Sequence, residues 1–509
     1  MQNSENNKRI AKNTLMLYIR MLVLMLVSLY TSRIVLQALG VEDFGINNVV
    51  AGFVSILAFF TSSLSNASQR YLSIGLGKND IAQATNSFRQ SYTLMLIFSG
   101  IVLILGETIG LWFVANKLVI PNDRLTAALW VYQFALVSTF CSINQVTLVA
   151  DIIARERMGI YAYLGIFESV ARLFVAFMLQ WVETIDTLIL FGILTALISL
   201  ITFAFHAWYC RKHFAEAKFK LRWDRSLVKG MSRFIGANLF GCFSWAAGVQ
   251  GINIILNLFF GPVVNAARGI AVQVNGAVAR FTDNVMTAIK PQIIKSYAAQ
   301  EHDYMKALVI RSTKYMALLL IVLGVPIIFE TPTILRIWLG QIPDYTVEYI
   351  RLIICEQFFS VLVGPLWIAA NATGDIKKNQ VYGRMITLLG LPISAAILLI
   401  HPNPIIPMIV LVIANMAYWI YCLYDIHTQI NLNIKSYLLK AVIPTVITAV
   451  CMSLACFTVL SIYTASSIFR FLIVGVISTL TGGILSFALA DSAERIIIYR
   501  FLKKIRERF

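Results

Sequence analysis

The chain has 509 residues, of which 59% are apolar and 13% are charged, and its formal net charge is +17. This composition lies far outside the usual mix of a soluble domain of this length and excludes a water-soluble fold. Its seven cysteines are odd in number, lie in or beside apolar runs and form no CxxC pair, so they predict neither a disulfide framework nor a metal site. The composition indicates an integral membrane protein.

Apolar segments recur along the whole chain. A hydrocarbon layer of ~30 Å requires about 20 residues of helix. We expect an all-α polytopic protein of about fourteen transmembrane helices, at residues 15–39, 44–66, 92–114, 127–150, 161–181, 188–210, 233–257, 262–287, 315–336, 347–370, 382–401, 404–425, 441–463 and 468–490. The first segment is too long for the core of a signal peptide, so we expect it to remain as an anchor.

The loops on the two sides differ strongly in basic residues. The set that includes both termini carries thirty-one Lys and Arg, whereas the opposite set carries only Lys117 and Arg124. The positive-inside rule then predicts a multi-pass protein of the cytoplasmic (inner) membrane with both termini in the cytoplasm. The excess positive charge is therefore a topology signal that also favours anionic lipid. It does not indicate a nucleic-acid partner.

The sequence repeats at an offset of about 221 to 224 residues. LGVEDFGINNVVAGF follows the first predicted helix, and FGPVVNAARGIAVQV follows the seventh. Each repeat holds six helices, an even number, so both begin on the same side and the repeat is parallel. We expect a six-helix bundle at residues 1–218, a second at 219–430, and an extra helix pair with a basic tail at 431–509. The tail is either an amphipathic helix on the inner leaflet or a plain cytoplasmic extension.

The predicted helix at 262–287 carries a polar stripe. At 100° per residue, Asn265, Arg268, Asn275 and Asp283 fall within an arc of about 80°. A charge in the bilayer costs about 2.5–3.5 kcal/mol and needs a partner, a wet cavity or a ligand. We expect the stripe to face a water-filled cavity and Arg268 to contact an anion, unless it pairs with an acid on another helix. Arg280 lies three residues before Asp283, so these two either pair with each other or both face the cavity.

Further charged residues lie inside predicted helices. Arg33 has no carboxylate three or four residues away, so it either contacts the same anion or extends to the outer interface. Glu168 and Arg172 stand four residues apart in the favourable order for an intrahelical pair, although Glu168 could instead carry a proton. Glu356 is another candidate for proton exchange. Arg470, at the outer end of its helix, is expected to be an interfacial anchor.

Motifs of common enzyme classes are missing from the sequence. It contains no GxxxxGK[ST] loop, no HExxH, no GxSxG and no Cys/His metal spacing. We therefore expect no enzyme activity, no metal site and no cofactor other than a coupling ion, H⁺ or Na⁺.

The run SRIVLQALGVEDFGINNVVAGF from Ser32, together with the 6+6+2 helix pattern of the whole chain, resembles the Wzx-type polysaccharide flippases, the PST branch of the MOP (MATE-like) superfamily. The resemblance implies two bundles around a cationic cavity that opens alternately to cytoplasm and periplasm. It implies transport of an undecaprenyl-pyrophosphate-linked oligosaccharide for O-antigen, capsule or exopolysaccharide assembly. Membrane lipid, a polysaccharide polymerase and glycosyltransferases are the implied partners, and coupling to H⁺ or Na⁺ is also implied. Asn47-Asn48 depart from the aromatic residue that these flippases often carry there.

Sister families fit this sequence less well. MurJ-type lipid II flippases usually place an acid directly after an arginine in this region, whereas Ile34 follows Arg33. MATE exporters typically have twelve helices. A cation-coupled MATE-type exporter of drugs or small molecules is nevertheless the alternative function, and a non-transporting scaffold for glycan enzymes is the third.

The chemistry of the arginines fits the implied substrate. Arginine binds phosphate oxygens at two points, and a pyrophosphate is the anionic group that these lipid-linked sugars share. We therefore expect the pyrophosphate to be bound by Arg33, Arg268 and Arg280 with Asn265 and Asn275. Ion coupling is expected at Asp283, Glu168 or Glu356.

Overall fold

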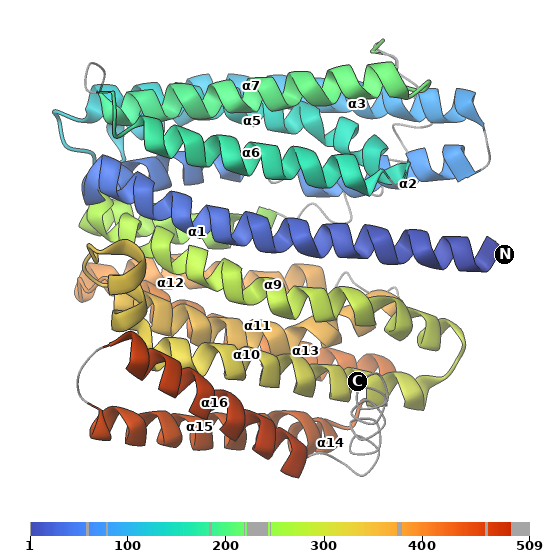
Figure 1. Cartoon of the computed structure of the whole chain (residues 1–509), viewed down its shortest axis with the longest axis vertical. Coiled ribbons are helices and arrows are strands. Elements are labelled where there is room, and N and C mark those ends of the chain that lie inside the picture. Colours follow the sequence, from blue (N-terminus) through green and yellow to red (C-terminus); the bar gives the residue numbers. More distant parts are fainter. Residues whose placement is uncertain are drawn as a thin grey trace. The chain divides into compact units, whose positions relative to one another are not determined.

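The computed structural model describes residues 2–57, 61–77, 80–155, 157–182, 186–217, 219–220, 243–244, 246–373, 379–463 and 467–489. Within these ranges the protein is built of helices and contains no strand, which confirms the all-α fold class. Within each of the two units described below, Figure 1 shows long helices that run roughly side by side.

The helices follow one another in a simple order, with short π-helical turns before α4, α12 and α15. Their bounds are α1 Gln2–Leu57, α2 Thr61–Gly77, α3 Ile81–Leu105, α4 Leu111–Asn116, α5 Leu125–Ala154, α6 Met158–Met178, α7 Thr187–His213, an unlabelled helix Ala246–Phe260, α9 Pro262–Ala298, α10 His302–Leu339, α11 Thr346–Thr373, α12 Arg384–Ile400, α13 Ile406–Ile430, α14 Ile434–Tyr437, α15 Ile443–Ile462 and α16 Ile468–Ala488.

Eleven segments of the described chain are long and apolar enough to cross a membrane. The protein is therefore a multi-pass membrane protein, although the predicted count of fourteen is not reached by this criterion. The helix Ala246–Phe260 is shorter than the others, and α9 has 37 residues but a mean hydropathy lowered by its polar stripe. The element α1 consists of two helices that meet at Gly40, where φ is 74° and ψ is 174°, so the predicted second helix, 44–66, does begin as a separate element beyond that glycine. Its predicted end is not confirmed, because α2 begins at Thr61 and residues 58–60 lie outside the described residues.

The chain forms two compact units, 1–269 with 388–407 (unit 1) and 270–387 with 408–509 (unit 2). These units cut across the predicted segments 1–218, 219–430 and 431–509, so that division by repeat stays a prediction. One reason for the difference lies in the two repeated corner segments. A Cβ on Gly45 would lie 1.9 Å from the Pro262 carbonyl oxygen, and one on Gly269 would lie 2.7 Å from the Asn48 side chain. The start of α9 therefore packs against α1 and belongs to unit 1.

In unit 2, helices α15 and α16 pack against α10. The contact includes a buried ion pair, in which Arg470 of α16 donates from Nε to Glu330 Oε1 at 2.6 Å and from Nη2 to Oε2 at 2.9 Å. The prediction that Arg470 is an interfacial anchor is wrong, because only 8% of this residue is exposed. Its charge is balanced by an acid 140 residues earlier in the sequence, which sequence spacing alone could not reveal.

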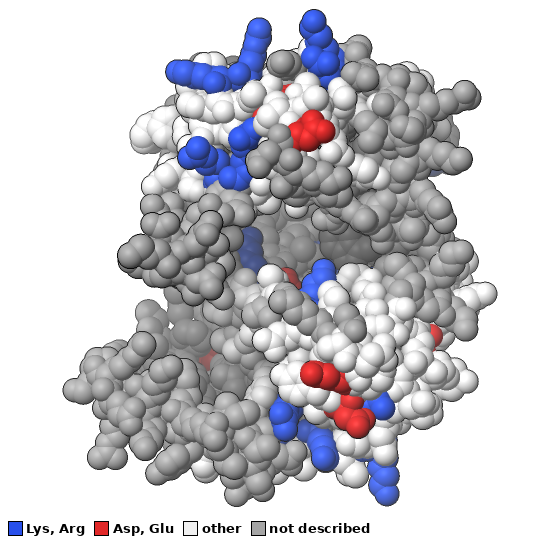
Figure 2. Space-filling view, turned by 90° about the vertical axis from the view of Figure 1, so that its right-hand side faces the viewer, with Lys and Arg blue, Asp and Glu red and all other residues white. Residues whose placement is uncertain are grey.

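Figure 2 looks onto the helix ends where α9 turns into α10. Lys and Arg side chains are visible among the described residues in this view. This distribution is the one that the positive-inside rule expects of a cytoplasmic face, and the orientation itself remains a prediction.

Candidate functional site

Unit 1 contains two neighbouring polar cavities, of about 170 and 220 Å³, that share Ser142 of α5 and Ser199 of α7. Most of their polar lining comes from hydroxyl and amide side chains of α5 and α7, with contributions from α1, α2 and α6. The polar lining residues are Asn47, Ser65, Ser138, Thr139, Ser142, Gln145, Thr195, Ser199 and Thr202. Such an interior can hold water or the polar part of a ligand within an otherwise apolar bundle.

The charged residues of these cavities are Arg172 and Glu168 of α6, one in each cavity. Arg172 donates from Nη2 to Glu168 Oε1 at 2.9 Å, which confirms the predicted intrahelical pair. Their side chains are 43% and 34% exposed, so both groups remain accessible from the cavities. Because the pair is neither buried nor locked by further bonds, either partner can exchange its bond for one with a charged ligand.

A histidine beside the second cavity was not singled out from the sequence. His206 of α7 is buried, its Nδ1 lies 2.7 Å from the Thr202 carbonyl oxygen, and Gln145 of the cavity wall lies 3.2 Å from the same ring. A lone histidine in an apolar helix gives no sequence signal, since only the packing of α5 on α7 brings it to Gln145.

Unit 2 contains a polar cavity of about 230 Å³ between α9, α10, α11, α12 and α13. Its polar lining includes Asp283, Gln357, Arg384 and Asn415. The Arg384 guanidinium lies over the ring of Tyr418 at 5.2 Å from its centroid. A guanidinium and a carboxylate thus face one small polar space, which suits an anion that is bound by the first and released with the help of the second.

Glu356 lies one residue before this cavity wall. Its Oε1 accepts a hydrogen bond from Asn415 Nδ2 at 3.1 Å, and Asn415 also lines the cavity. The predicted ion-coupling residues Asp283 and Glu356 are therefore joined to the same cavity, one directly and one through an amide. Their role in coupling stays a prediction.

The polar stripe of α9 divides into two parts. Asn265 and Arg268 are 0% and 3% exposed, and they donate to backbone carbonyls of the preceding helix, Asn253 at 2.7 Å and Val249 at 3.0 Å. The expectation that the whole stripe faces a water-filled cavity is wrong for these two residues, because the helix Ala246–Phe260 covers them. Asn275 reaches Gln357 of α11 at 3.5 Å, and Asp283 lines the polar cavity of unit 2.

The remaining predicted residues lie away from the described cavities. Arg33 on α1 and Arg280 on α9 are both half-buried, and neither lines a described cavity. Among the described ion pairs, none joins Arg280 to Asp283. Arg384 was missed because the sequence placed it with the basic loop before its helix. Its position at the start of an apolar run was the available signal.

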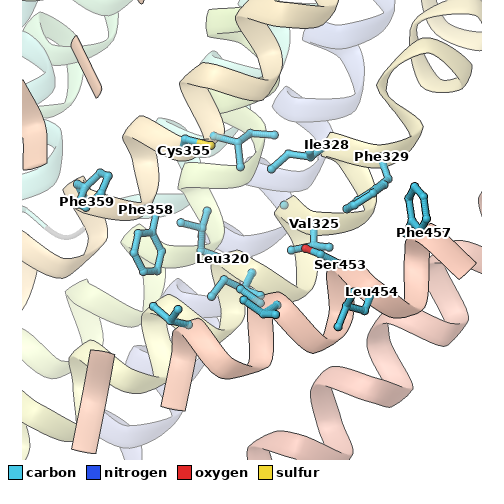
Figure 3. Close-up of a pocket in the computed structure, with 16 residues that line it drawn as sticks. Leu320, Val325, Ile328, Phe329, Cys355, Phe358, Phe359, Ser453, Leu454 and Phe457 are labelled. Atoms are coloured by element: carbon cyan, nitrogen blue, oxygen red, sulfur yellow. The ribbon is translucent and has the colours of Figure 1, made fainter. Parts of the chain in front are cut away.

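An apolar groove of about 580 Å³ lies beside the C-terminal helix pair of unit 2. Figure 3 shows its walls, with Val325 and Phe329 from α10, Cys355 and Phe358 from α11, and Phe457 from α15. Among the sixteen lining residues, Ser453 and Cys355 are the only ones with a polar side-chain atom. The groove therefore suits a hydrocarbon chain.

No protein-family model matches the sequence, and no curated protein matches it. The fold is similar to that of several solved transporters. A lipid II flippase, MurJ, in an inward closed conformation has a TM-score of 0.67 at 13% identity and covers 97% of this chain and 99% of its own. An inward-facing multidrug resistance MATE transporter of the MOP superfamily has a TM-score of 0.63 at 13% identity and covers 82% and 98%.

A third match is a MOP superfamily transporter from Pyrococcus furiosus, described as having a binding pocket of reversed polarity. It has a TM-score of 0.59 at 14% identity and covers 82% of this chain and 96% of its own. The chain therefore has the fold of MOP superfamily transporters.

Proposed function

We propose that this protein is a flippase that moves a polyprenyl-pyrophosphate-linked oligosaccharide from the cytoplasmic to the periplasmic face of the inner membrane by alternating access, for assembly of a surface polysaccharide. The observation that carries the proposal is the extent of the fold match. The flippase match covers 97% of the chain and the MATE match 82%. This difference is about as long as the C-terminal segment with α15 and α16. A match that extends over nearly the whole chain supports a lipid flippase over an exporter.

The charge of the cavities supports an anionic head group. Arg384 in unit 2 and Arg172 in unit 1 are the guanidinium groups that line the described cavities. A guanidinium binds two phosphate oxygens at once, and a pyrophosphate offers enough oxygens for more than one such contact. We assign the first phosphate contact to Arg384, since Gln357 and Asn415 beside it add hydrogen-bond donors.

The apolar groove supports a lipid-linked substrate rather than a free one. A polyprenyl chain can lie against the aromatic and aliphatic side chains of α10, α11 and α15 while the head group occupies a polar site. The polyprenyl chain then stays in the hydrocarbon layer, and only the pyrophosphate and sugar need a polar path across it.

Release of the head group requires weakening of the phosphate contact. Asp283 lines the same cavity as Arg384, so its deprotonated form competes with the phosphate for the guanidinium. A membrane potential negative inside also favours outward movement of an anion, by about 2.3 kcal/mol per charge per 100 mV. The coupling ion in this scheme is a proton.

Complementation of a deletion strain tests the proposal. Arg384→Gln should reduce surface glycan about tenfold or more, as expected for the loss of one phosphate contact, with lipid-linked precursor retained on the inner face. Lys306→Gln is the matched control, because Lys306 loses the same charge at the start of α10, where it lies 3.7 Å from Asp303. Arg33→Ala and Arg268→Ala test the predicted contacts in the same assay. Normal surface glycan in the deletion strain itself would refute the flippase.

The alternative is a cation-coupled exporter of drugs or small molecules. The observation that favours it is that the match covers 98% of a MATE transporter, so a whole exporter core is present. A deletion strain that shows drug sensitivity with unchanged surface glycan would decide for this alternative.

A further inference from the structure

The inner end of unit 1 holds a cluster of two acids and one arginine that the proposed transport site does not use. Asp151 lies in the last turn of α5, Arg155 follows that helix, and Glu216 lies three residues beyond the end of α7. Asp151 and Glu216 are both 0% exposed. The sequence places the two acids 65 residues apart, so only the fold brings them together.

The arginine serves one of the two acids. Arg155 donates from Nε to Glu216 Oε1 at 2.5 Å and from Nη2 to Oε2, so the guanidinium forms a two-point pair with Glu216. Neither carboxyl oxygen of Asp151 accepts a hydrogen bond in the described chain. Arg155 follows Asp151 by one helical turn, with its N–H donating to the Asp151 carbonyl oxygen at 3.0 Å, so the Glu216 carboxyl that Arg155 holds lies in the neighbourhood of the Asp151 carboxyl. Two carboxylates cannot bond to each other, but a carboxylic acid and a carboxylate can.

The charge balance of the cluster also indicates that one of the two acids is protonated. With both acids ionised, the cluster has a net charge of −1, and the two carboxyl groups themselves are shielded from water, so an uncompensated carboxylate there is unfavourable. Two carboxyl groups that share such a site do not both ionise. One proton makes the cluster neutral and provides the hydrogen bond that Asp151 otherwise lacks.

Among the described residues, the neighbouring helices supply no alternative donor to Asp151. Cys210 of α7 is within electrostatic reach of both acids, but its thiol donates to the Leu148 carbonyl oxygen at 3.6 Å. Arg89 and Tyr92 of α3 and Tyr161 of α6 belong to the same end of the unit, and none of them bonds to Asp151. The side chain of Arg70 on α2 lies outside the described residues.

The cluster also fixes the chain that leaves α7. Phe214 and Ala217 are buried, and Arg155 lies over the Phe214 ring at 5.2 Å. Phe219 packs edge-on against Phe88 and Tyr92 of α3, at 5.7 and 5.1 Å between ring centroids. Residues 214–217 and Phe219 are thus held on unit 1 around the buried acids.

We propose that Asp151 and Glu216 share one proton, and that this proton keeps residues 214–219 docked on unit 1. When the proton leaves, two neighbouring carboxylates are balanced by only one guanidinium. Their repulsion then drives Glu216 and its segment away from α5. The site binds a proton whatever the transported substrate is, so it does not rest on the proposed function.

Infrared difference spectroscopy of the full-length protein in lipid nanodiscs tests the proton directly. A pH titration of the wild type should show the carbonyl band of a protonated carboxylic acid, with loss of that band in Asp151→Asn. The matched control is Asp43→Asn in the outer acid pair of unit 1, where Arg124 bonds both acids, and it should retain the band. A band that survives Asp151→Asn overturns the proposal. A band that disappears when choline is replaced by sodium overturns it as well, since the site would then bind sodium.

Hydrogen exchange tests the docking. In the wild type, exchange of the peptide that contains residues 210–219 should accelerate about tenfold per pH unit above the pKa of the shared proton, after correction for the intrinsic pH dependence. Asp151→Asn mimics the protonated acid, so its peptide should stay protected at all pH values. Equal pH dependence in the wild type and Asp151→Asn would overturn the docking role. If Asp151→Asn fails to fold, Glu216→Gln takes its place, because Arg155 then balances the single remaining carboxylate and the band should likewise be lost; a band that survives in this variant overturns the proposal.

Discussion

Two ends of unit 1 carry the same charges in different geometry. At the end that the predicted topology makes the outer one, Arg124 lies between Asp43 and Asp186; at the end that it makes the inner one, Arg155 binds Glu216 and follows Asp151 by one helical turn. Arg124 donates to both of its acids, from Nε to Asp43 at 2.8 Å and from Nη1 to Asp186 at 2.6 Å. Arg155 donates only to Glu216. Each cluster thus has two acids and one arginine, but only the outer one satisfies both carboxylates without a proton.

Contact with water and hydrogen bonds from backbone N–H groups further stabilise the ionised acids of the outer cluster. The side chains of Asp43, Arg124 and Asp186 are 14%, 22% and 30% exposed. Asp186 also caps α7, since its Oδ1 accepts from the N–H groups of Leu188 and Ile189. The outer cluster joins α1, α5 and α7 by fixed bonds, whereas the inner cluster depends on a titratable one. Equal charge counts thus give a structural contact in one place and a proton site in the other.

The largest expected effect is that of Arg155→Gln. It leaves two buried carboxylates without a guanidinium, a change that costs about 3–5 kcal/mol in comparable buried pairs. We expect a strong loss of folded protein, measured by thermal unfolding in detergent and by monodisperse yield. Adding Glu216→Gln should recover most of the loss, because the remaining Asp151 can then be protonated on its own. Failure of the double variant to recover would contradict the importance of charge in this cluster.

Arg124→Gln is expected to have a smaller effect, of about 1–3 kcal/mol. Its acids are partly exposed, and Asp186 keeps its two backbone donors. The measurement is the same thermal unfolding, with Arg155→Gln alongside. If Arg124→Gln were the more damaging of the two, the contrast between the ends of unit 1 would be reversed.

Acid should weaken the outer end with a smaller effect again. Burial raises the pKa of Asp186, but hydrogen bonds from Arg124 and from the N–H groups of Leu188 and Ile189 lower it by more. The net result is a pKa below the usual 3.8. A carboxyl group whose pKa is lower in the folded than in the unfolded protein stabilises the fold at pH values above its unfolded-state pKa. This stabilisation is lost as the pH falls through the lowered pKa. Exchange at the start of α7 should therefore rise in acid, whereas exchange of residues 210–219 should rise in alkali. An Asp186→Asn protein whose α7 exchange shows the wild-type acid response would disprove this origin.

The smallest effect on stability is expected for Glu168→Gln. The Glu168–Arg172 pair is exposed to its cavities and joins residues on one helix, a type of pair worth about 0.3–0.5 kcal/mol. We expect a change in melting temperature close to the error of the measurement, with a clear defect in glycan export. A variant that melts much earlier and still exports normally would show that this pair stabilises the bundle instead.

Local sequence patterns predicted the membrane class, most helix positions and the Glu168–Arg172 pair. A bilayer fixes the length and apolarity of a helix, and backbone bonds in lipid must close within it. A pair four residues apart lies on one helix face whatever surrounds it. The same periodicity correctly placed Asp283 on a polar face, yet it could not show that Asn265 and Arg268, on that face, are covered by the preceding helix.

Contacts between helices were decided by the tertiary structure alone. Arg470 forms an ion pair with Glu330, Glu216 is bound by the arginine that follows Asp151 by one turn, and Arg384 and Asp283 line the same cavity. Each contact depends on how far a helix is rotated and shifted against its neighbour, which a hydrophobic pattern leaves open. In this protein the sequence determined which charges enter the membrane, and the packing determined which are balanced by a partner, which face a cavity and which retain a proton.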